Sequence, residues 1–383
     1  MTPKDVLTNP YFCPMPWTGL MYNFDGTVKN CIRSAGAIGN IKDTPIENIT
    51  QGNTNILTQN RIISDTPVPT CHTCYNLENG KKGFDIVSDR KFYIRELKHI
   101  GLDTYRAGKF DLQTIDVRWT NLCNFACTYC TPEFSSKWAD ELGIKQDVPT
   151  DQQRADFKEY IFKHAGQLKH VYLAGGEPLL MKENLELLEL LDPDVNLRIN
   201  TNLSKVDTRV FDRICEFKNV HWTVSVETIE DEFEYIRHGG KWQDFLDNLK
   251  IIQKLDHKIS FNMLHFLLNY QTVFGCVDYL KGLGFHNNAF IIGALLEPEY
   301  LNIRHLPDSV LQSVKSILEA RINESPGYLL EDSYRNMLHY IEQPYKKDFL
   351  GSMQELYTLD KRRKLDSSKI FKDLYNIKEN YHG

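Results

Sequence analysis

The chain lacks any apolar run that approaches the roughly 20 residues needed to cross a bilayer as a helix. Its opening stretch, MTPKDVLTNPYF, also lacks the apolar segment of a secretory leader. Internal repeats and low-complexity segments are absent from the sequence. We therefore expect a cytoplasmic protein with no membrane partner.

The chain also has no excess of positive charge. Its net charge is −6, which gives no general attraction to nucleic acid or to an anionic membrane. The short basic run Lys361–Lys364 is predicted to be a solvated helix face, with nucleic-acid contact as the alternative. With 383 residues, of which 42% are hydrophobic and 25% charged, the composition fits a globular protein of two or three domains.

Cysteine, in contrast, is plentiful, with nine residues in the chain. In a reducing compartment this number points to metal or catalytic chemistry rather than to disulfides. Cys123, Cys127 and Cys130 are spaced C-x3-C-x2-C, directly after the apolar strand-like run Thr114–Trp119. Structural zinc normally has four protein ligands, whereas three thiolates on a cubic 4Fe–4S cluster leave one iron open. The alternative is three buried structural thiols.

The neighbours of these cysteines identify a family. Asn124 and Phe125 follow the first cysteine, and Tyr129 precedes the third. With these neighbours the loop resembles the radical S-adenosylmethionine (radical SAM) family. The resemblance implies that the three cysteines hold a 4Fe–4S cluster and that its open iron binds the methionine part of SAM, with Tyr129 among the residues around the cofactor.

Strand-like runs alternate with amphipathic helical runs after the cysteine loop. The predicted strands are Ile115–Trp119, His170–Ala174, Asn196–Thr201, His221–Glu227, Lys258–Leu264 and Ala289–Gly293. The predicted helices between them are Asp151–His164, Glu183–Leu191, Thr208–Phe217, Trp242–Leu255 and Thr272–Leu283. Six β/α repeats predict an α/β fold with a parallel sheet, short of the eight repeats of a closed TIM barrel. A partial, TIM-like (β/α)6 barrel is therefore expected, and the resemblance implies the same core. Ligands bind at the carboxyl ends of such strands, where the cysteine loop lies.

The second predicted strand ends in the sequence Gly175-Gly176-Glu177-Pro178. The glycines permit close backbone approach to a ligand, and the carboxylate can accept hydrogen bonds from an ammonium group. Taken alone, this segment is equally an ordinary strand-to-helix turn. One repeat after the cysteine loop, it resembles the family motif that holds the amino group of SAM, a role thereby implied for Gly175, Gly176 and Glu177.

Two later strand ends also resemble the SAM site of the family. Asn200 lies in a polar strand end, for which a plain asparagine turn is the alternative. Ser225 and Arg237 resemble the pair that binds the SAM carboxylate in peptide-modifying members, and the alternative for Arg237 is a solvated helix arginine. Many members carry Asp where this chain has Glu227, and no role is predicted for Glu227.

A second set of cysteines, Cys13, Cys31, Cys71 and Cys74, precedes the predicted barrel. Four thiolates close a metal site, and their spacing does not separate structural zinc from a second 4Fe–4S cluster. The flanking sequences FCP and DGTV resemble the auxiliary-cluster domains called SPASM and twitch, which implies an accessory 4Fe–4S cluster with an electron-transfer or structural role. Such domains usually follow the barrel. We expect the segment to have little core of its own.

The sequence thus predicts four parts. They are a twitch/SPASM-like domain (1–95), a connector (96–112), a radical SAM partial barrel (113–300) and a helical C-terminal extension (301–383). Cys215 and Cys276 stand alone in helical patterns and are assigned to packing.

The resemblance implies an oxidoreductase-type enzyme that cleaves SAM reductively, giving a 5′-deoxyadenosyl radical that abstracts hydrogen from a substrate. The expected reaction is oxidative modification of a peptide or protein, and the alternative is dehydrogenation or rearrangement of a small metabolite such as a sugar or nucleotide. A zinc-stabilised binding protein without catalysis is the alternative of another class. An electron donor such as flavodoxin or ferredoxin is the expected partner, and no catalytic acid or base is predicted.

Overall fold

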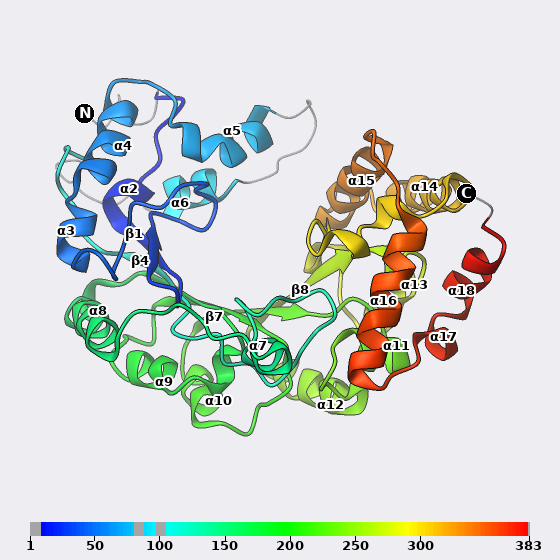
Figure 1. Ribbon diagram of the computed structural model, residues 1–383. Helices are drawn as coiled ribbons and strands as arrows, with labels where there is room; N and C mark the ends of the chain where they lie inside the picture. The colour runs from blue at the N-terminus through cyan, green and yellow to red at the C-terminus, as the bar shows by residue number, and fades with distance from the viewer. Residues whose placement is uncertain (1–8, 80–87, 97–104, 382–383) are drawn as a thin grey trace. The chain divides into compact units, whose positions relative to one another are not determined.

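The computed structural model describes residues 9–79, 88–96 and 105–381 (Figure 1). They divide into two compact units, the first formed by residues up to 122, 144–199 and 207–220, the second by 123–143, 200–206 and 221 onward. Residues 97–104 of the predicted connector, and residues 1–8 and 80–87 of the predicted N-terminal domain, lie outside the described residues. Within the described ranges, no helix is both long enough and apolar enough to cross a membrane.

The first unit contains a mixed sheet with the strand order β3-β2-β1-β4-β5-β6. The strands are β1 (Gly19–Tyr22), β2 (Thr27–Lys29), β3 (Gly39–Asn40), β4 (Thr114–Val117), β5 (His170–Leu173) and β6 (Asn196–Thr201). β1, β4, β5 and β6 run parallel, whereas β2 and β3 pair antiparallel. The N-terminal segment therefore adds strands to the sheet of the predicted repeats. The sequence did not predict them, because strands of two to four residues are too short for a period-2 pattern.

Helices precede, separate and follow these strands along the chain. They are α2 (Met15–Thr18), α3 (Ile46–Thr50), α4 (Asn53–Ile63), α5 (His72–Asn79), α6 (Asp89–Glu96), α8 (Asp151–Lys163), α9 (Lys182–Leu188) and α10 (Arg209–Ile214). The start of α8 is fixed by a reciprocal capping box, in which the side chains of Thr150 and Gln153 each accept a hydrogen bond from the other residue's backbone N–H. α9 and α10 pack against each other (Figure 1).

The N-terminal segment has an aromatic core of its own. Its buried members are Phe12, Trp17, Ile62, Val68 and Tyr105. The ring centroids of Phe12 and Trp17 each lie within 5.5 Å of the centroid of Tyr105, in edge-to-face contacts. The expectation of little core in this segment is therefore wrong, because the aromatic residues that build it are widely spaced in the sequence.

The sheet of the first unit has one apolar and one polar face. Ile115, Val171 and Leu197 are at most 1% exposed and lie side by side in register on one face. Because successive strand residues point to opposite faces, the next residue of each strand points the other way. These residues are Asp116, Tyr172 and Arg198, also in register.

The second unit contains three parallel strands and most of the later helices. The strands are β7 (Asn219–Ser225), β8 (Lys258–His265) and β9 (Phe290–Ala294). The helices are α7 (Ser136–Leu142), α11 (Glu230–Ile236), α12 (Trp242–Ile252), α13 (Thr272–Gly282), α14 (Asp308–Glu324), α15 (Leu329–Glu342), α16 (Phe349–Arg363), α17 (Ser367–Ile370) and α18 (Lys372–Glu379). α15 packs on β9, where the backbone N–H of Ile292 donates to Ser333 Oγ at 3.0 Å.

Each of the six strands from β4 to β9 runs parallel to its partner and is followed by a helix (Figure 1). This is the series of β/α repeats predicted for a partial barrel, and the α/β fold class is confirmed. The helices α14 to α18, yellow to red in Figure 1, confirm the helical C-terminal extension.

Candidate functional site

The loop that carries Cys123, Cys127 and Cys130 is held by backbone hydrogen bonds to the segment after α11. The N–H of Ala126 donates to the carbonyl of His238 at 2.8 Å, and the N–H of Thr128 donates to the carbonyl of Ile236 at 2.7 Å. These two bonds fix the backbone of the loop against the C-terminal end of α11 and the residues that follow it.

Helix α7 holds the same loop from its other flank. Ser135, the N-cap of α7, donates through its hydroxyl to the carbonyl of Phe125 at 2.6 Å. Trp138 Nε1 donates to the carbonyl of Cys127 at 2.6 Å. Two buried side chains of one helix thus bind two carbonyls of the cysteine loop, which fixes where its thiols lie.

The three thiols lie together in an apolar setting. Cys123 and Cys127 are buried against Phe125, and Cys130 and Tyr129 pack on the same cluster. Burial raises the pKa of Cys127. Burial also raises the pKa of Cys130, and repulsion from the thiolates of Cys127 and Cys123 raises it further. Three thiolates here need a positive counter-charge, which the iron of a cluster supplies.

An asparagine after β6 touches this loop. Asn202 Nδ2 lies 3.9 Å from Cys123 Sγ and donates to Asn124 Oδ1 at 3.1 Å. The sequence predicted a role for Asn200, which lies two residues earlier, within β6. Both residues belong to the same polar strand end, but only the structure shows that Asn202 is the one in contact with the cysteine.

A buried ion pair lies beside the loop. Arg237 donates from Nε to Glu227 Oε2 at 2.8 Å and from Nη2 to Glu227 Oε1 at 2.7 Å. Tyr129 donates to Glu227 Oε1 at 3.0 Å, and the Arg237 guanidinium lies 5.8 Å from the centre of the Tyr129 ring. Because the side chains of Arg237 and Glu227 are 3% and 2% exposed, the alternative of a solvated arginine is wrong. Glu227, to which the sequence gave no role, is the centre of this network.

Ser225 is the last residue of β7 and lies in register with Asn262 of β8. It is therefore at the carboxyl end of its strand, as predicted. Glu227 follows it after one residue, so the predicted serine and the unpredicted carboxylate share one strand end.

The segment Gly175–Glu177 packs on the residues that lead into the cysteine loop. The backbone N–H of Glu177 donates to the carbonyl of Leu122 at 2.7 Å. A Cβ on Gly176 would lie 2.1 Å from that same carbonyl oxygen, and Gly175 has a φ of +110°. Only glycine fits both positions. Glu177 itself is fully buried and accepts a hydrogen bond from the N–H of Leu179 at 3.1 Å.

The thiols of the N-terminal set act on one another electrostatically. Burial raises the pKa of Cys13 well above its usual range, and the thiolates of Cys31, Cys71 and Cys74 raise it further. Burial, followed by repulsion from Cys71, raises the pKa of Cys31 to about 12. Burial, followed by repulsion from Cys74, raises the pKa of Cys71 to about 11. The four thiols predicted from their spacing are therefore within electrostatic reach of one another.

Arg90 of α6 connects the segments that carry these thiols. It pairs with Glu78 of α5 and donates from Nη1 to the carbonyl of Phe12 at 2.8 Å. Its backbone N–H hydrogen-bonds to the thiol of Cys74, which opposes the rise that burial causes in the pKa of that thiol. The sequence gave no signal for this role, because Arg90 lies outside the cysteine motifs.

No three His, Cys, Asp or Glu side chains in residues 9–79, 88–96 and 105–381 are close enough to chelate one metal ion. A cubic cluster does not require that arrangement, because each thiolate binds a different iron. Buried and partly buried thiols with backbone N–H donors around them fit such a group in both sets.

The basic run Lys361–Lys364 at the end of α16 is only partly solvated. Lys361, Arg362 and Lys364 are exposed, but the side chain of Arg363 is 2% exposed. The prediction of a solvated face is therefore wrong for Arg363. This residue packs on Trp138, more than 200 positions earlier in the chain, and the sequence gives no sign of that contact.

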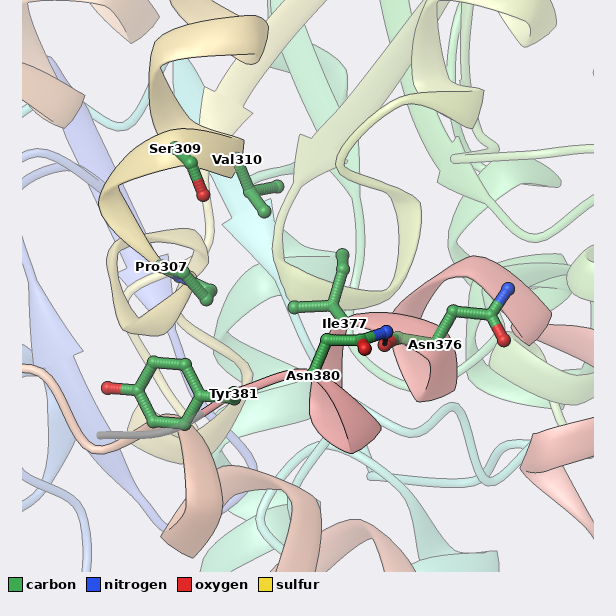
Figure 2. A pocket seen from close by; sticks show the side chains of 7 residues that line it. All are labelled: Pro307, Ser309, Val310, Asn376, Ile377, Asn380 and Tyr381. Atoms are coloured by element: carbon green, nitrogen blue, oxygen red, sulfur yellow. Dashed lines mark hydrogen bonds between the residues drawn. The ribbon is translucent and has the colours of Figure 1, made fainter.

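An open hollow of about 610 Å³ lies elsewhere in the second unit (Figure 2). Its lining residues are Pro307, Ser309, Val310, Asn376, Ile377, Asn380 and Tyr381. None of these residues is charged, and none belongs to the predicted site.

Comparison with known proteins finds two domain families in the chain. The model of the radical SAM superfamily matches residues 117–280, and that of an iron–sulfur cluster-binding domain, SPASM, matches residues 13–75. A GTP 3′,8-cyclase of Streptomyces coelicolor is 29% identical over 171 residues, 42% of this chain and 46% of that protein. A 7-carboxy-7-deazaguanine synthase of Clostridium acetobutylicum is 39% identical over 77 residues, 20% of this chain and 31% of that protein. The chain thus spans less than half the length of these two curated relatives.

Solved structures with a similar chain path include anSMEcpe with bound AdoMet, with a TM-score of 0.40 and 17% identity over 56% of this chain and 63% of that one. SuiB of Streptococcus suis, bound to its precursor peptide SuiA, has a TM-score of 0.41 and 13% identity over 71% of this chain and 60% of that one. The two family models cover the two cysteine sets separately, in the order that the sequence predicted. The chain carries a radical SAM domain at residues 117–280 and, on its N-terminal side, a SPASM iron–sulfur cluster-binding domain at residues 13–75.

Proposed function

We propose that this protein binds two 4Fe–4S clusters, cleaves SAM reductively at one of them and oxidatively modifies a peptide or protein side chain. The observation that carries the proposal is the cysteine loop, which places two buried thiols and one partly buried thiol together and is fixed by α7 and by the C-terminal end of α11 with the residues after it. When bound, the clusters and SAM supply the electron transfer and the 5′-deoxyadenosyl radical that abstracts hydrogen from the substrate.

The residues around the loop have separate tasks in this proposal. Cys123, Cys127 and Cys130 hold the SAM-binding cluster, and Asn202 orients the first of these thiols. Tyr129 is fixed by its hydrogen bond to Glu227.

The SAM contacts are assigned by charge. Glu177, buried and ionisable, receives the ammonium group of SAM, while Gly175 and Gly176 allow its segment to approach closely. Arg237 binds the SAM carboxylate through the donors that Glu227 does not use, and Ser225 lies at the strand end just before Glu227. Asn200 completes the predicted cofactor contacts.

Tyr93 interacts with one auxiliary thiol, that of Cys31, and with the polar face of the first unit's sheet. Burial raises the pKa of Tyr93 of α6, and Asp89, Asp116 and the Cys31 thiolate raise it further. The Tyr93 ring also lies 6.0 Å from the ring of His170, centroid to centroid, on β5. Tyr93 is thus within electrostatic reach of both an auxiliary thiol and the polar face. We assign Cys13, Cys31, Cys71 and Cys74 to an auxiliary cluster that takes an electron from the substrate.

A nucleotide is the second candidate substrate. The observation that favours it is the name of several curated relatives, GTP 3′,8-cyclase, among which one of Sulfurimonas denitrificans aligns with 60% of this chain. Incubation of the reduced, reconstituted protein with SAM and GTP separates the two candidates. Conversion of GTP would establish the nucleotide reaction, whereas unchanged GTP in protein that cleaves SAM keeps the peptide as substrate.

Metal analysis of anaerobically reconstituted protein tests the proposal. We expect about eight irons and about eight sulfides per chain, the content of two four-iron cubes. Zinc bound stoichiometrically to the N-terminal set, with only about four irons, would contradict the auxiliary cluster and leave that domain structural.

Glu177→Gln is expected to weaken SAM binding by about 10- to 150-fold, because a hydrogen bond to a charged group is worth roughly 1.5–3 kcal/mol. The substitution keeps the shape and the acceptor for Leu179 but removes the negative charge. Equilibrium binding of SAM to reconstituted protein measures the change. Glu189→Gln, at an exposed carboxylate in the same repeat, is the control. An unchanged affinity in Glu177→Gln protein with its full iron content would place the ammonium site elsewhere.

Cys71→Ala combined with Cys74→Ala is expected to remove about half of the iron and to leave SAM cleavage in place. The aromatic core of this segment keeps it folded without the cluster. The measurement is 5′-deoxyadenosine formed under dithionite, compared with Cys215→Ala, which changes a thiol outside both sets. If cleavage stops while the remaining irons stay bound, the auxiliary set shapes the SAM site and the division of roles is incorrect.

A further inference from the structure

The C-terminal helix α16 packs directly on the cysteine loop. Leu359 of α16 lies in a buried cluster with Ala126 of the loop and Trp138 of α7, and Cys130 packs against that cluster. Asp360 fixes the helix in place, because its Oδ1 accepts a hydrogen bond from the buried Tyr235 hydroxyl at 2.7 Å. The end of α16 is therefore held next to the three thiols.

Arg363, the last residue of α16, lies against the tryptophan that holds the loop. Its guanidinium carbon is 4.4 Å from the centre of the Trp138 ring, and Trp138 Nε1 donates to the carbonyl of Cys127. Arg363 Nε donates to the two carboxylate oxygens of Glu141 at 3.1 and 3.0 Å. With a side chain that is 2% exposed, this cation is almost fully removed from water.

Arg363 shares the carboxylate of Glu141 with a second cation. Arg362 Nη1 lies 3.5 Å from the same Glu141 carboxylate, so that two guanidinium groups share one negative charge. His238, whose carbonyl accepts from the loop, also faces this group, and the positive charge of Arg363 adds to burial in lowering the pKa of its imidazole.

Two nitrogens of Arg363 still have unused donors. Nη1 and Nη2 make no hydrogen bond to any described residue, although Nη2 lies 3.0 Å from Glu141 Oε2 without an aligned N–H. A buried cation with unused donors is costly unless a further negative charge lies nearby. The anionic cluster on three thiolates is the partner that the cysteine loop offers.

We propose that Arg363 supplies the positive charge that stabilises the reduced form of the cluster on Cys123, Cys127 and Cys130 and thereby raises its midpoint potential. The inference rests on the proposed function. Its physical basis is that a positive charge favours the more negative of two redox states, the same reason for which hydrogen bonds and nearby charge set cluster potentials. Arg363 reaches this loop through Trp138, on which it packs and which donates a hydrogen bond to the carbonyl of Cys127.

A redox titration of the reconstituted full chain, followed by the electron paramagnetic resonance signal that SAM perturbs, tests the inference. Arg363→Met keeps the packing on Trp138 and removes the charge. At a fixed potential we expect the ratio of reduced to oxidised cluster to fall about tenfold, the order for one unit charge about 10 Å away at an effective dielectric near 20. For a one-electron couple that is a shift of about 59 mV. Arg363→Lys keeps the positive charge, so its midpoint potential should stay close to that of the wild-type protein.

Two further variants make the result decisive. Glu141→Gln removes the negative charge that opposes Arg363 and should therefore raise the midpoint potential, the opposite of the shift in Arg363→Met. This measurement can be read whether or not Arg363→Met protein binds its full iron. Lys361→Gln, at an exposed cation that lies over Tyr357 on the same helix, should leave the potential unchanged.

An unchanged potential in Arg363→Met and Glu141→Gln proteins with full iron content would overturn the inference and leave Arg363 a packing residue. A wild-type chain that binds no iron on the loop would instead overturn the proposed function itself. A downward shift in Arg363→Met, with an upward shift in Glu141→Gln, is the result that supports the inference.

Discussion

Replacement of Cys123, Cys127 and Cys130 by alanine is expected to abolish reductive cleavage of SAM and to remove about half of the iron. The reason is that these three thiols share one buried loop, so that no other cysteine is placed to replace them. Formation of 5′-deoxyadenosine under dithionite should fall to the level without enzyme. Iron analysis should leave about four irons, held by the N-terminal set.

The reciprocal variant gives this experiment its control. Cys71→Ala with Cys74→Ala removes a similar amount of iron from the other set, so loss of cleavage can be assigned to the loop and not to iron content in general. Residual cleavage in the triple variant, above the level without enzyme, would show that SAM binds at the N-terminal set.

Glu227→Ala is expected to lower the free energy of unfolding by about 3–5 kcal/mol, the cost of leaving a buried charge without its partner. Arg237 is 2% exposed and makes two hydrogen bonds to this carboxylate, and Tyr129 makes a third. Loss of the carboxylate therefore leaves a cation and a hydroxyl unpaired in the core. Urea denaturation followed by circular dichroism measures the change.

A double variant distinguishes the ion pair from simple loss of volume. Glu227→Ala combined with Arg237→Met removes both charges, and it should be more stable than Glu227→Ala alone because no buried charge remains unpaired. Asp247→Ala, which breaks an exposed pair with Lys250, should destabilise the protein far less than Glu227→Ala. A double variant that is less stable than Glu227→Ala would mean that Arg237 does not depend on Glu227.

The fold could be predicted where the signal is local and repeated. Each strand from β4 to β9 lies within two residues of its predicted bounds, because apolar strands alternate with capped helices along the chain. The strands β1 to β3 were missed. They are short, and β1 joins the sheet by pairing with β4, about 95 residues later, while β2 and β3 join it through β1. Such pairing leaves no periodic pattern in the sequence.

The site shows the same division between local and distant signals. The spacing of Cys123, Cys127 and Cys130 was enough to predict that they share one site. The consecutive positions of Gly175, Gly176 and Glu177 were enough to predict a ligand-binding segment. The partners that fix these residues come from far along the chain: Glu227 is 98 positions from Tyr129. Glu141 is 222 positions from Arg363, which the sequence assigned to a solvated face. Charge pairs at such separations follow from tertiary packing.

Reductive cleavage of SAM by the wild-type chain is the most direct test of the central claim. Anaerobically reconstituted protein with its iron content established is incubated with SAM and dithionite, and 5′-deoxyadenosine and methionine are quantified. We predict equal amounts of the two products, formed well above the level without enzyme and absent when Cys123, Cys127 and Cys130 are replaced. No 5′-deoxyadenosine from protein that carries its full iron content would contradict the assignment of this loop as a SAM-cleaving site.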